Sequence, residues 1–196
     1  LFRSLFRGRE DVYAQRFVTK DGKRGYQPVC RNRWSIECKA HKYKCEGCAH
    51  RDLVPLDDAV IRRHLHKGAK ETDIIGLFPI MEDNTCFFLC ADFDDKNCQH
   101  GYKDDVLSYV GVCNDWNIPV YIERSRSGNG AHLWIFFSEP VSAALARKLG
   151  FAILGSAMER NVQLDMKSYD RFFPNQDFVP KGGFGNSHGK IVDLNA

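Results

Sequence analysis

Apolar and polar positions along most of the chain follow the spacings of helices and strands in alternation. Asp57 and Asp58 precede apolar residues at helical intervals and predict a capped amphipathic helix, and similar intervals predict helices over residues 102–116 and 141–160. Shorter apolar runs predict strands over residues 74–80, 86–94, 118–123, 131–137 and 169–173. The resulting order, strand–strand–helix–strand–strand–helix–strand, is typical of an α/β sandwich with a mostly antiparallel sheet and helices on one face.

The longest of these helices, over residues 141–160, carries one apolar stripe. The stripe is formed by Leu145, Leu149, Ile153 and Met158. Because residues three or four positions apart lie on one side of a helix, we expect a stripe of this kind to pack on the sheet.

The first 56 residues carry a different pattern. They are polar and basic, with one short strand expected over residues 25–29 and four of the eight cysteines. We expect residues 1–56 to form a basic, cysteine-bearing segment of the same domain, and residues 57–196 to form its main core. A chain of 196 residues has room for one domain, or for one domain with a small insert.

The composition narrows the class of protein. Hydrophobic residues make up 43% of the chain and charged residues 27%, which is enough apolar material for a sizeable core. No apolar run approaches the roughly 18–20 residues that a membrane-spanning helix needs, and this excludes an integral membrane protein. The formal net charge is only +3, which does not by itself indicate a nucleic-acid partner.

The eight cysteines are unevenly spread, and their positions favour a reducing, cytoplasmic environment. Cys86 and Cys90 lie inside an apolar run, where free thiols behave as small hydrophobic side chains. Four others lie close together and end in a Cys-x-x-Cys spacing: Cys30, Cys38, Cys45 and Cys48. Four such thiolates are the ligand set of a closed structural Zn²⁺ site. His41 and His50 are substitute ligands, and four free thiols are the alternative.

Two carboxylates end the most apolar of the predicted strands. Because side chains alternate along a strand, Asp92 and Asp94 share one face while Phe93 occupies the other. Adjacent carboxylates repel each other unless a positive charge lies between them, and Mg²⁺ or Mn²⁺ takes such oxygen ligands. The pattern indicates a divalent-cation site, and a solvated strand end is the alternative.

A polar loop separates the strands predicted over residues 118–123 and 131–137. Its glycines let backbone N–H groups approach an anion, which a hydroxyl and guanidinium groups can also bind. The candidate phosphate-binding stretch runs from Arg124 to His132 and carries two arginines, two serines and a histidine. An ordinary hairpin loop with a hydrogen-bonded histidine is the alternative, because serine, glycine and asparagine are also turn residues.

A third acid would complete a two-metal site for in-line phosphoryl displacement. Asp165 and Asp170 are the two candidates. Asp170 opens the last predicted strand, as Asp92 and Asp94 close theirs, whereas Asp165 lies in the preceding turn. We therefore favour Asp170 and keep Asp165 as the alternative.

Together these motifs resemble the archaeo-eukaryotic primase superfamily, and most closely the primase-polymerases of bacterial conflict systems, including CRISPR-associated ones. The resemblance extends from residue 6 to residue 186 and rests on residues 6–14, 25–30, 123–137 and 168–177. It implies an archaeo-eukaryotic primase fold, which is an RRM-like, mostly antiparallel sheet with helices packed on it, here with an N-terminal zinc-binding segment. Residues 57–196 would be the catalytic core.

The resemblance also implies an activity, that of a template-directed nucleotidyltransferase or DNA primase-polymerase that starts primers and extends them from nucleoside triphosphates. The implied catalytic residues are Asp92, Asp94, Asp170 and His132. The three acids would hold two Mg²⁺ or Mn²⁺ ions, and a Zn²⁺ would be structural. The implied nucleotide-binding residues are Arg126, Ser127, Asn129, His132 and Lys181. The implied partners are a DNA template and primer, nucleoside triphosphates, and CRISPR adaptation proteins or a helicase module, with no membrane.

Two other classes of protein are compatible with parts of the pattern. A two-metal nuclease or phosphoesterase would use the same three acids. A non-catalytic, zinc-bearing nucleic-acid-binding module would keep the cysteines and the basic residues near them, which are Arg31, Arg33, Lys39, Lys42 and Lys44. The triphosphate-binding loop argues against both classes, because neither needs it.

Overall fold

The computed structural model describes residues 2–66, 68, 70–95, 101–125, 128–160, 166–184 and 192–193. The chain forms two compact units: an N-terminal unit, made of Gly8–Asp83 and Phe178–Asn195, and a central unit, made of Leu1–Arg7 and Asn84–Asp177. We expected a division after residue 56, whereas residues 57–83 fall in the same unit as residues 8–56. No helix among the described residues is both long and apolar enough to span a membrane.

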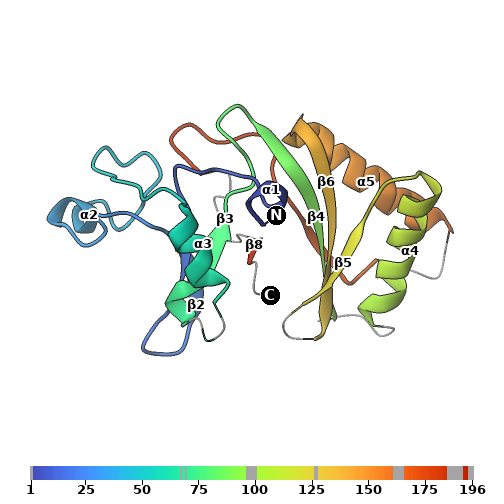
Figure 1. Cartoon of the computed structure of the whole chain (residues 1–196), viewed down its shortest axis with the longest axis horizontal. Coiled ribbons are helices and arrows are strands. Elements are labelled where there is room, and N and C mark those ends of the chain that lie inside the picture. The colour runs from blue at the N-terminus through green and yellow to red at the C-terminus, as the bar shows by residue number, and fades with distance from the viewer. Residues whose placement is uncertain are drawn as a thin grey trace. The chain divides into compact units, whose positions relative to one another are not determined.

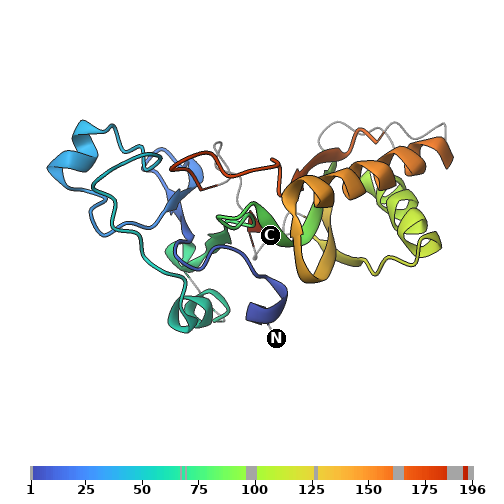
Figure 2. The same cartoon turned by 90° about the horizontal axis from the view of Figure 1, so that it is seen from above.

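The central unit is built on an antiparallel sheet with strand order β5-β6-β4-β7. Its strands are β4 (Thr85–Asp94), β5 (Tyr121–Arg124), β6 (Gly130–Ser142) and β7 (Tyr169–Phe173). Helices α4 (Tyr102–Asp115) and α5 (Ala143–Arg160) cover one face of this sheet, and the short helix α1 (Phe2–Leu5) lies on the other (Figure 1). Figure 2 shows α4 and α5 side by side on their common face.

The two faces of the central sheet differ in chemistry. Alternation along β4 places Leu89, Ala91 and Phe93 in a buried apolar core with residues of α4 and α5. One end of the opposite face is aromatic: Phe6 packs there with ring centroids 5.1–6.4 Å from those of Phe88, Trp134 and Phe136. The other end of that face is polar, and it carries the candidate site.

Helix α5 corrects one prediction. Leu145 and Met158 were expected to pack on the sheet, but their side chains are 56% and 43% exposed, whereas Ile153 is buried as expected. The helix turns small residues toward the sheet, and a Cβ added at Gly150 would lie only 2.8 Å from the ring of Phe172. So close an approach of helix and sheet needs small side chains on the helix. The spacing of large apolar residues in the sequence does not indicate where those small residues face.

The strand predicted over residues 74–80 is also different in the structure. Only Ile75–Leu77 forms a strand, β3, and it belongs to the sheet of the N-terminal unit rather than to the central sheet. Pro79 has no N–H to donate to a sheet ladder, which explains the early end of the strand. Gly76 of β3 pairs with Ala14, a residue far away in sequence, and local periodicity does not specify such a partner.

The N-terminal unit has its own antiparallel sheet with strand order β2-β1-β3-β8. Its remaining elements are β1 (Ala14–Val18), β2 (Arg24–Pro28), α2 (Ile36–Ala40), α3 (Asp58–His64), the 3₁₀ turn η1 (Glu71–Asp73) and β8 (Val192–Asp193). The helix predicted after Asp57 is confirmed, because the Asp57 carboxylate accepts the N–H of Val60 at 2.8 Å and so caps α3.

Candidate functional site

Three carboxylates meet at the polar end of the central sheet, on the face opposite α4 and α5. Asp92 and Asp94 come from β4 and Asp170 from β7, and one oxygen of each lies within 4.8 Å of the others. Across the described part of the chain, no other three acidic, histidine or cysteine side chains bring ligand atoms so close together. The chemistry of this donor set fits a hard divalent cation, which takes carboxylate oxygens.

A β-bulge explains how Asp170 reaches the two carboxylates of β4. The register passes from Asp92↔Arg171 to Phe93↔Tyr169, which leaves Asp170 as the extra residue of β7. In a regular ladder Asp170 would pair with Phe93 and point into the apolar core. The bulge turns its carboxylate to the face of Asp92 instead.

Ser168 and Asp105 anchor the turn that precedes this bulge. The carbonyl oxygen of Ser168 accepts the N–H of Asp94 at 2.7 Å. The carboxylate of Asp105, on α4, accepts the Ser168 hydroxyl at 2.5 Å and its N–H at 3.2 Å. Both residues are buried, so the helix-covered side of the sheet helps to hold the acids in place.

His132 lies beside the acids on the neighbouring strand β6. Its Nε2 is 3.5 Å from the Asp92 carboxylate and its Nδ1 is 3.3 Å from Glu123, which also accepts the Trp134 Nε1–H at 2.7 Å. Burial lowers the pKa of His132, but the hydrogen bond to Glu123 and the charges of Asp92, Glu123 and Asp94 together outweigh it, so the pKa is raised. The site therefore combines three acids with an imidazole that favours its cationic form.

Sequence reasoning missed two residues of this site, Glu123 and Arg171. Arg171 donates to the Asp170 carboxylate at 2.8 and 3.1 Å, and this hydrogen bonding is the largest cause of the raised pKa of Arg171. Glu123 pairs with His132 in the ladder between β5 and β6. Counting outward from the hairpin loop gives that pairing, so the sequence did carry a signal for Glu123.

The described ends of the loop between β5 and β6, Ser125 and Gly128–Asn129, are hydrogen-bonded to β6 and to the end of β4. The N–H of Ser125 donates to the carbonyl of Gly130 at 3.0 Å, and the N–H of Asp95 donates to the carbonyl of Asn129 at 2.9 Å. Gly128 has φ 76°, in the left-handed region that glycine adopts without steric cost. The predicted phosphate-binding residue Asn129 is thus held next to the strand end that carries Asp94.

The other predicted residues of this site lie outside the described part of the central unit. Arg126 and Ser127, and the alternative acid Asp165, lie outside the described residues. Lys181 is exposed and belongs to the N-terminal unit.

A comparison with family models identifies the family. The model described as "TOTE conflict system, Archaeo-Eukaryotic Primase domain" matches residues 1–188. The chain belongs to this family. No curated protein matches it.

Membership of the archaeo-eukaryotic primase domain family confirms the predicted superfamily and makes the chain a member of a primase-polymerase family. The mixed α/β architecture with antiparallel sheets fits such a domain. Members of the superfamily are typically nucleotidyltransferase-like and generally depend on divalent metals, and their substrates are nucleic acids and nucleotides. The cluster of Asp92, Asp94 and Asp170 fits that dependence.

The four clustered cysteines of this primase domain are free, partly buried thiols in the N-terminal unit. The N–H of Asp52 donates to the Cys30 sulfur at 3.3 Å, and Arg33 donates to the Cys45 sulfur at 3.6 Å. Burial raises the pKa of Cys45, Arg33 opposes this, and the nearby Cys30 and Cys38 raise the pKa further. No three of the four sulfurs lie within 4.8 Å of one another, so zinc binding stays a prediction.

Proposed function

We propose that this protein is a template-directed nucleotidyltransferase that starts DNA primers and extends them from nucleoside triphosphates. The observation that carries the proposal is the cluster of Asp92, Asp94 and Asp170 beside His132, in a chain that belongs to an archaeo-eukaryotic primase family. Three carboxylates beside an imidazole whose pKa is raised suit a reaction between a triphosphate and a hydroxyl group.

Each acid would act from a fixed position. Asp92, Asp94 and Asp170 would hold two Mg²⁺ or Mn²⁺ ions, which when bound activate the 3′ hydroxyl and neutralise the triphosphate and the leaving pyrophosphate. The fully buried ring of Phe93 keeps Asp92 and Asp94 on one face of β4. Arg171, which donates to Asp170, offsets part of the repulsion among the three acids.

The triphosphate would be bound by the loop between β5 and β6 and by His132. The Glu123 carboxylate accepts the Nδ1–H of His132, which leaves Nε2 directed toward Asp92. From this position Nε2 would bind a β- or γ-phosphate oxygen. Asn129, together with Arg126 and Ser127 of the same loop, would bind further phosphate oxygens. Lys181 would add a positive charge.

The substrates that follow from this activity are a DNA template and primer and nucleoside triphosphates. We propose a conflict system as the biological setting, with a helicase module or CRISPR adaptation proteins as protein partners. The seven described cysteines are free thiols, and this suits action in a reducing cytoplasm.

Replacing both Asp92 and Asp94 by alanine tests the catalytic proposal. Primed template, labelled nucleotides and Mn²⁺ or Mg²⁺ are incubated with the protein, and the products are resolved on a sequencing gel. We expect the wild type to lengthen the primer and the double variant to lose about a thousandfold or more in rate, because metal-held transition-state stabilisation amounts to several kcal/mol. Calorimetric titration with Mn²⁺ alone should show binding only to the wild type.

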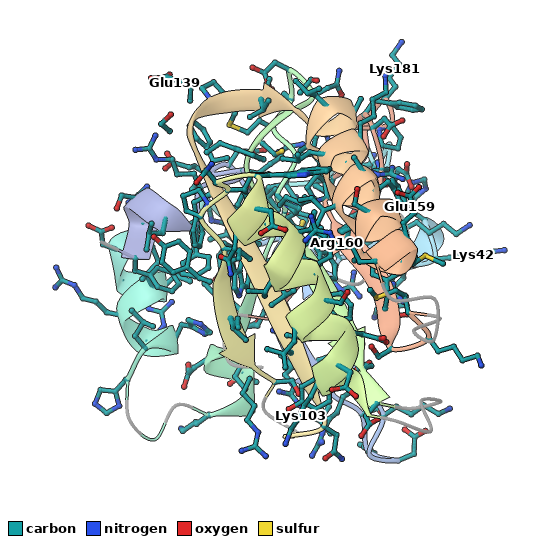
Figure 3. The ribbon with its side chains drawn as sticks, turned by 90° about the vertical axis from the view of Figure 1, so that its right-hand side faces the viewer. Lys42, Lys103, Glu139, Glu159, Arg160 and Lys181 are labelled. Carbon is teal, nitrogen blue, oxygen red and sulfur yellow. The ribbon has the colours of Figure 1, made fainter. Side chains whose placement is uncertain are left out.

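The double variant should melt near the wild-type temperature, because Phe93 stays in the core and two adjacent like charges are removed. Asp104→Ala with Glu159→Ala is the matched control, since it removes two exposed charges from α4 and α5 of the same unit (Glu159 is labelled in Figure 3). The control should synthesise normally. Undiminished synthesis by the folded Asp92→Ala/Asp94→Ala protein would contradict the proposal. Primer shortening by the wild type would indicate a nuclease instead, and binding without any product a non-catalytic module.

We also propose that Cys30, Cys38, Cys45 and Cys48 bind one structural Zn²⁺. All four thiols are partly buried in one loop-rich segment, and two of the sulfurs already accept hydrogen bonds from Arg33 and from the N–H of Asp52. Hydrogen bonds of this kind orient and stabilise thiolate ligands. Zinc would draw the four sulfurs together and stabilise a segment that has little apolar core.

Elemental analysis of the purified protein should find about one Zn²⁺ per chain. Cys48→Ser should lose the metal and unfold the N-terminal unit at lower temperature, because a structural zinc contributes directly to folding. Cys113→Ala is the control, since it removes a buried thiol from the central unit and should keep the metal. A protein that neither carries zinc nor binds added zinc would contradict the proposal.

A further inference from the structure

The segment between the clustered cysteines carries exposed apolar side chains that do not belong to the core. Trp34 is 69% exposed, Ile36 81% and Tyr43 40%. The rings of Trp34 and Tyr43 lie together, with centroids 5.6 Å apart and planes inclined by 63°. Single exposed apolar residues are ordinary in proteins, but a paired tryptophan and tyrosine form a small aromatic surface.

Arg33 and the loop backbone hold these two rings in place. The Arg33 guanidinium lies 5.7 Å from the centroid of Trp34 and 5.6 Å from that of Tyr43, and it donates to the Tyr43 carbonyl at 3.1 Å. Lys42 and Tyr43 have φ values of 53° and 58°, so two successive residues with a Cβ adopt the left-handed conformation. Residues in such uncommon conformations gather at functional sites, because the strain persists only where the surrounding structure holds it.

The same segment is strongly basic. Residues 30–50 contain five lysines and arginines against two glutamates, a net charge of +3 that equals the formal net charge of the whole chain. Three of these cations, Lys39, Lys42 and Lys44, are exposed, and Figure 3 shows Lys42 extending away from the ribbon. The excess positive charge of the chain is therefore concentrated around the two rings.

We infer that Trp34, Tyr43 and these three lysines form a binding surface for single-stranded nucleic acid. Exposed aromatic rings stack on bases, and neighbouring cations bind the phosphates between them. Stacking on a side chain needs a base with a free face, which a single strand offers and an intact duplex does not. Protein interfaces are also rich in tryptophan and tyrosine, but lysine is depleted there, so the three lysines favour a polyanion over a protein partner. The role of the bound strand as the template rests on the proposed function, whereas the binding itself does not.

Fluorescence anisotropy of a labelled oligothymidylate tests this inference in the absence of nucleoside triphosphates. A length of about 15 nucleotides is near the upper end of the site sizes of such surfaces. Trp34→Ala with Tyr43→Ala should weaken binding roughly tenfold or more, because each stacked base contributes a factor of about five to more than a hundred. Trp116→Ala is the matched control, since it removes a tryptophan that is 42% exposed in the central unit, and it should leave the affinity unchanged.

Two further variants separate stacking and charge from a merely structural role. Trp34→Phe keeps a ring for stacking and should retain most of the affinity. It should also remove the tryptophan fluorescence of residue 34, which a stacked base quenches in the wild type. Replacing Lys39, Lys42 and Lys44 by glutamine should reduce the slope of log affinity against log salt by about 2, because each phosphate contact on a single strand adds roughly 0.7. A change in fold stability would not alter that slope.

Circular dichroism melting curves check that the variants fold, which we expect because the replaced side chains are exposed. Equal affinity of the wild type and the Trp34→Ala/Tyr43→Ala protein would overturn the inference, and so would a folded wild type that does not bind the oligonucleotide. Failure of this inference is distinguishable from failure of the catalytic proposal. A protein that binds through Trp34 but makes no primer would contradict the proposed function and leave this surface standing.

Discussion

The chemistry of His132 depends on the two carboxylates beside it. The Glu123 carboxylate accepts the Nδ1–H of His132, and Asp92 faces Nε2, so one acid orients the ring while the other belongs to the acidic cluster. Hydrogen bonding and charge raise the pKa of His132 in spite of its burial. A histidine held in this way can present a positive charge to a phosphate, which an unpaired surface histidine near neutral pH does less well.

Replacing His132 by alanine should weaken nucleoside triphosphate binding by about 10- to 100-fold, because a charge-assisted hydrogen bond contributes about 1.5–3 kcal/mol. DNA binding should be unchanged. Titration of each variant with nucleotide and Mg²⁺ measures the effect, and His66→Ala is a control at an exposed position of the N-terminal unit. If nucleotide affinity is the same in the His132 variant, the adjacent loop is only a hairpin.

At the scale of elements, the most consequential feature of the sheet is the extra residue of β7. The bulge at Asp170 converts a residue that regular alternation would bury into a member of the acidic cluster. Its geometry is held from the other side of the sheet, where Asp105 of α4 accepts both the hydroxyl and the N–H of Ser168. Helix α4 therefore contributes to the site without touching it.

Asp105→Ala should lower the stability of the central unit by about 1–3 kcal/mol, because the buried N–H and hydroxyl of Ser168 lose their acceptor. It should also weaken Mn²⁺ binding, since the turn that positions Asp170 is loosened. Urea unfolding and Mn²⁺ titration measure the two effects. Asp115→Ala is the control, because it breaks only an exposed ion pair with Arg160 and should cost less than about 1 kcal/mol. Unchanged Mn²⁺ affinity in Asp105→Ala would mean that the bulge holds without this anchor.

At the scale of the whole molecule, neither unit is continuous in sequence, and Arg9 joins the parts of the N-terminal unit. The Arg9 side chain is almost fully buried. It donates to the Asp11 carboxylate at 2.7 Å, to Glu82 at 3.0 Å and to the carbonyl of Gly183 at 3.4 Å. One guanidinium therefore connects residues from the beginning, the middle and the end of the chain.

This connection should depend on pH. The hydrogen bond from Arg9 is the largest influence on Asp11 and lowers its pKa below the ordinary value. A carboxylate with a lowered pKa in the folded state stabilises the fold above its unfolded-state pKa of about 3.9, and this stability is lost as the pH falls through the folded-state pKa. Asp11→Asn should therefore cost about 1 kcal/mol at neutral pH, since Asp11 is half exposed and Glu82 remains. Thermal melts of both proteins from pH 7 to about pH 3 should converge at the acidic end. If the melting temperatures of the two proteins differ by the same amount at every pH, the stability lost in Asp11→Asn comes from packing rather than from charge.

Several features of the fold could be predicted from the sequence because they depend on neighbours along the chain. Alternation along residues 86–94 was enough to put Asp92 and Asp94 on one face and Phe93 in the core. The cap at Asp57 and the helix over residues 102–116 follow in the same way from local hydrogen bonding and apolar spacing. Prolines shifted the ends of predicted strands, since β5 begins at Tyr121, beyond Pro119, which has no N–H to donate.

By itself, then, the sequence determined that Asp92 and Asp94 share a strand face and where α3 and α4 begin, since short-range sterics and burial decide these. It also indicated the motifs of the candidate site. Only the tertiary structure decided that β3 pairs with β1 rather than with the central sheet, and that Gly150 allows α5 to approach Phe172. It also decided that a bulge brings Asp170 to the other two acids. Each of these depends on the register between segments far apart in sequence, and a shift of one residue reverses the face of every side chain on a strand.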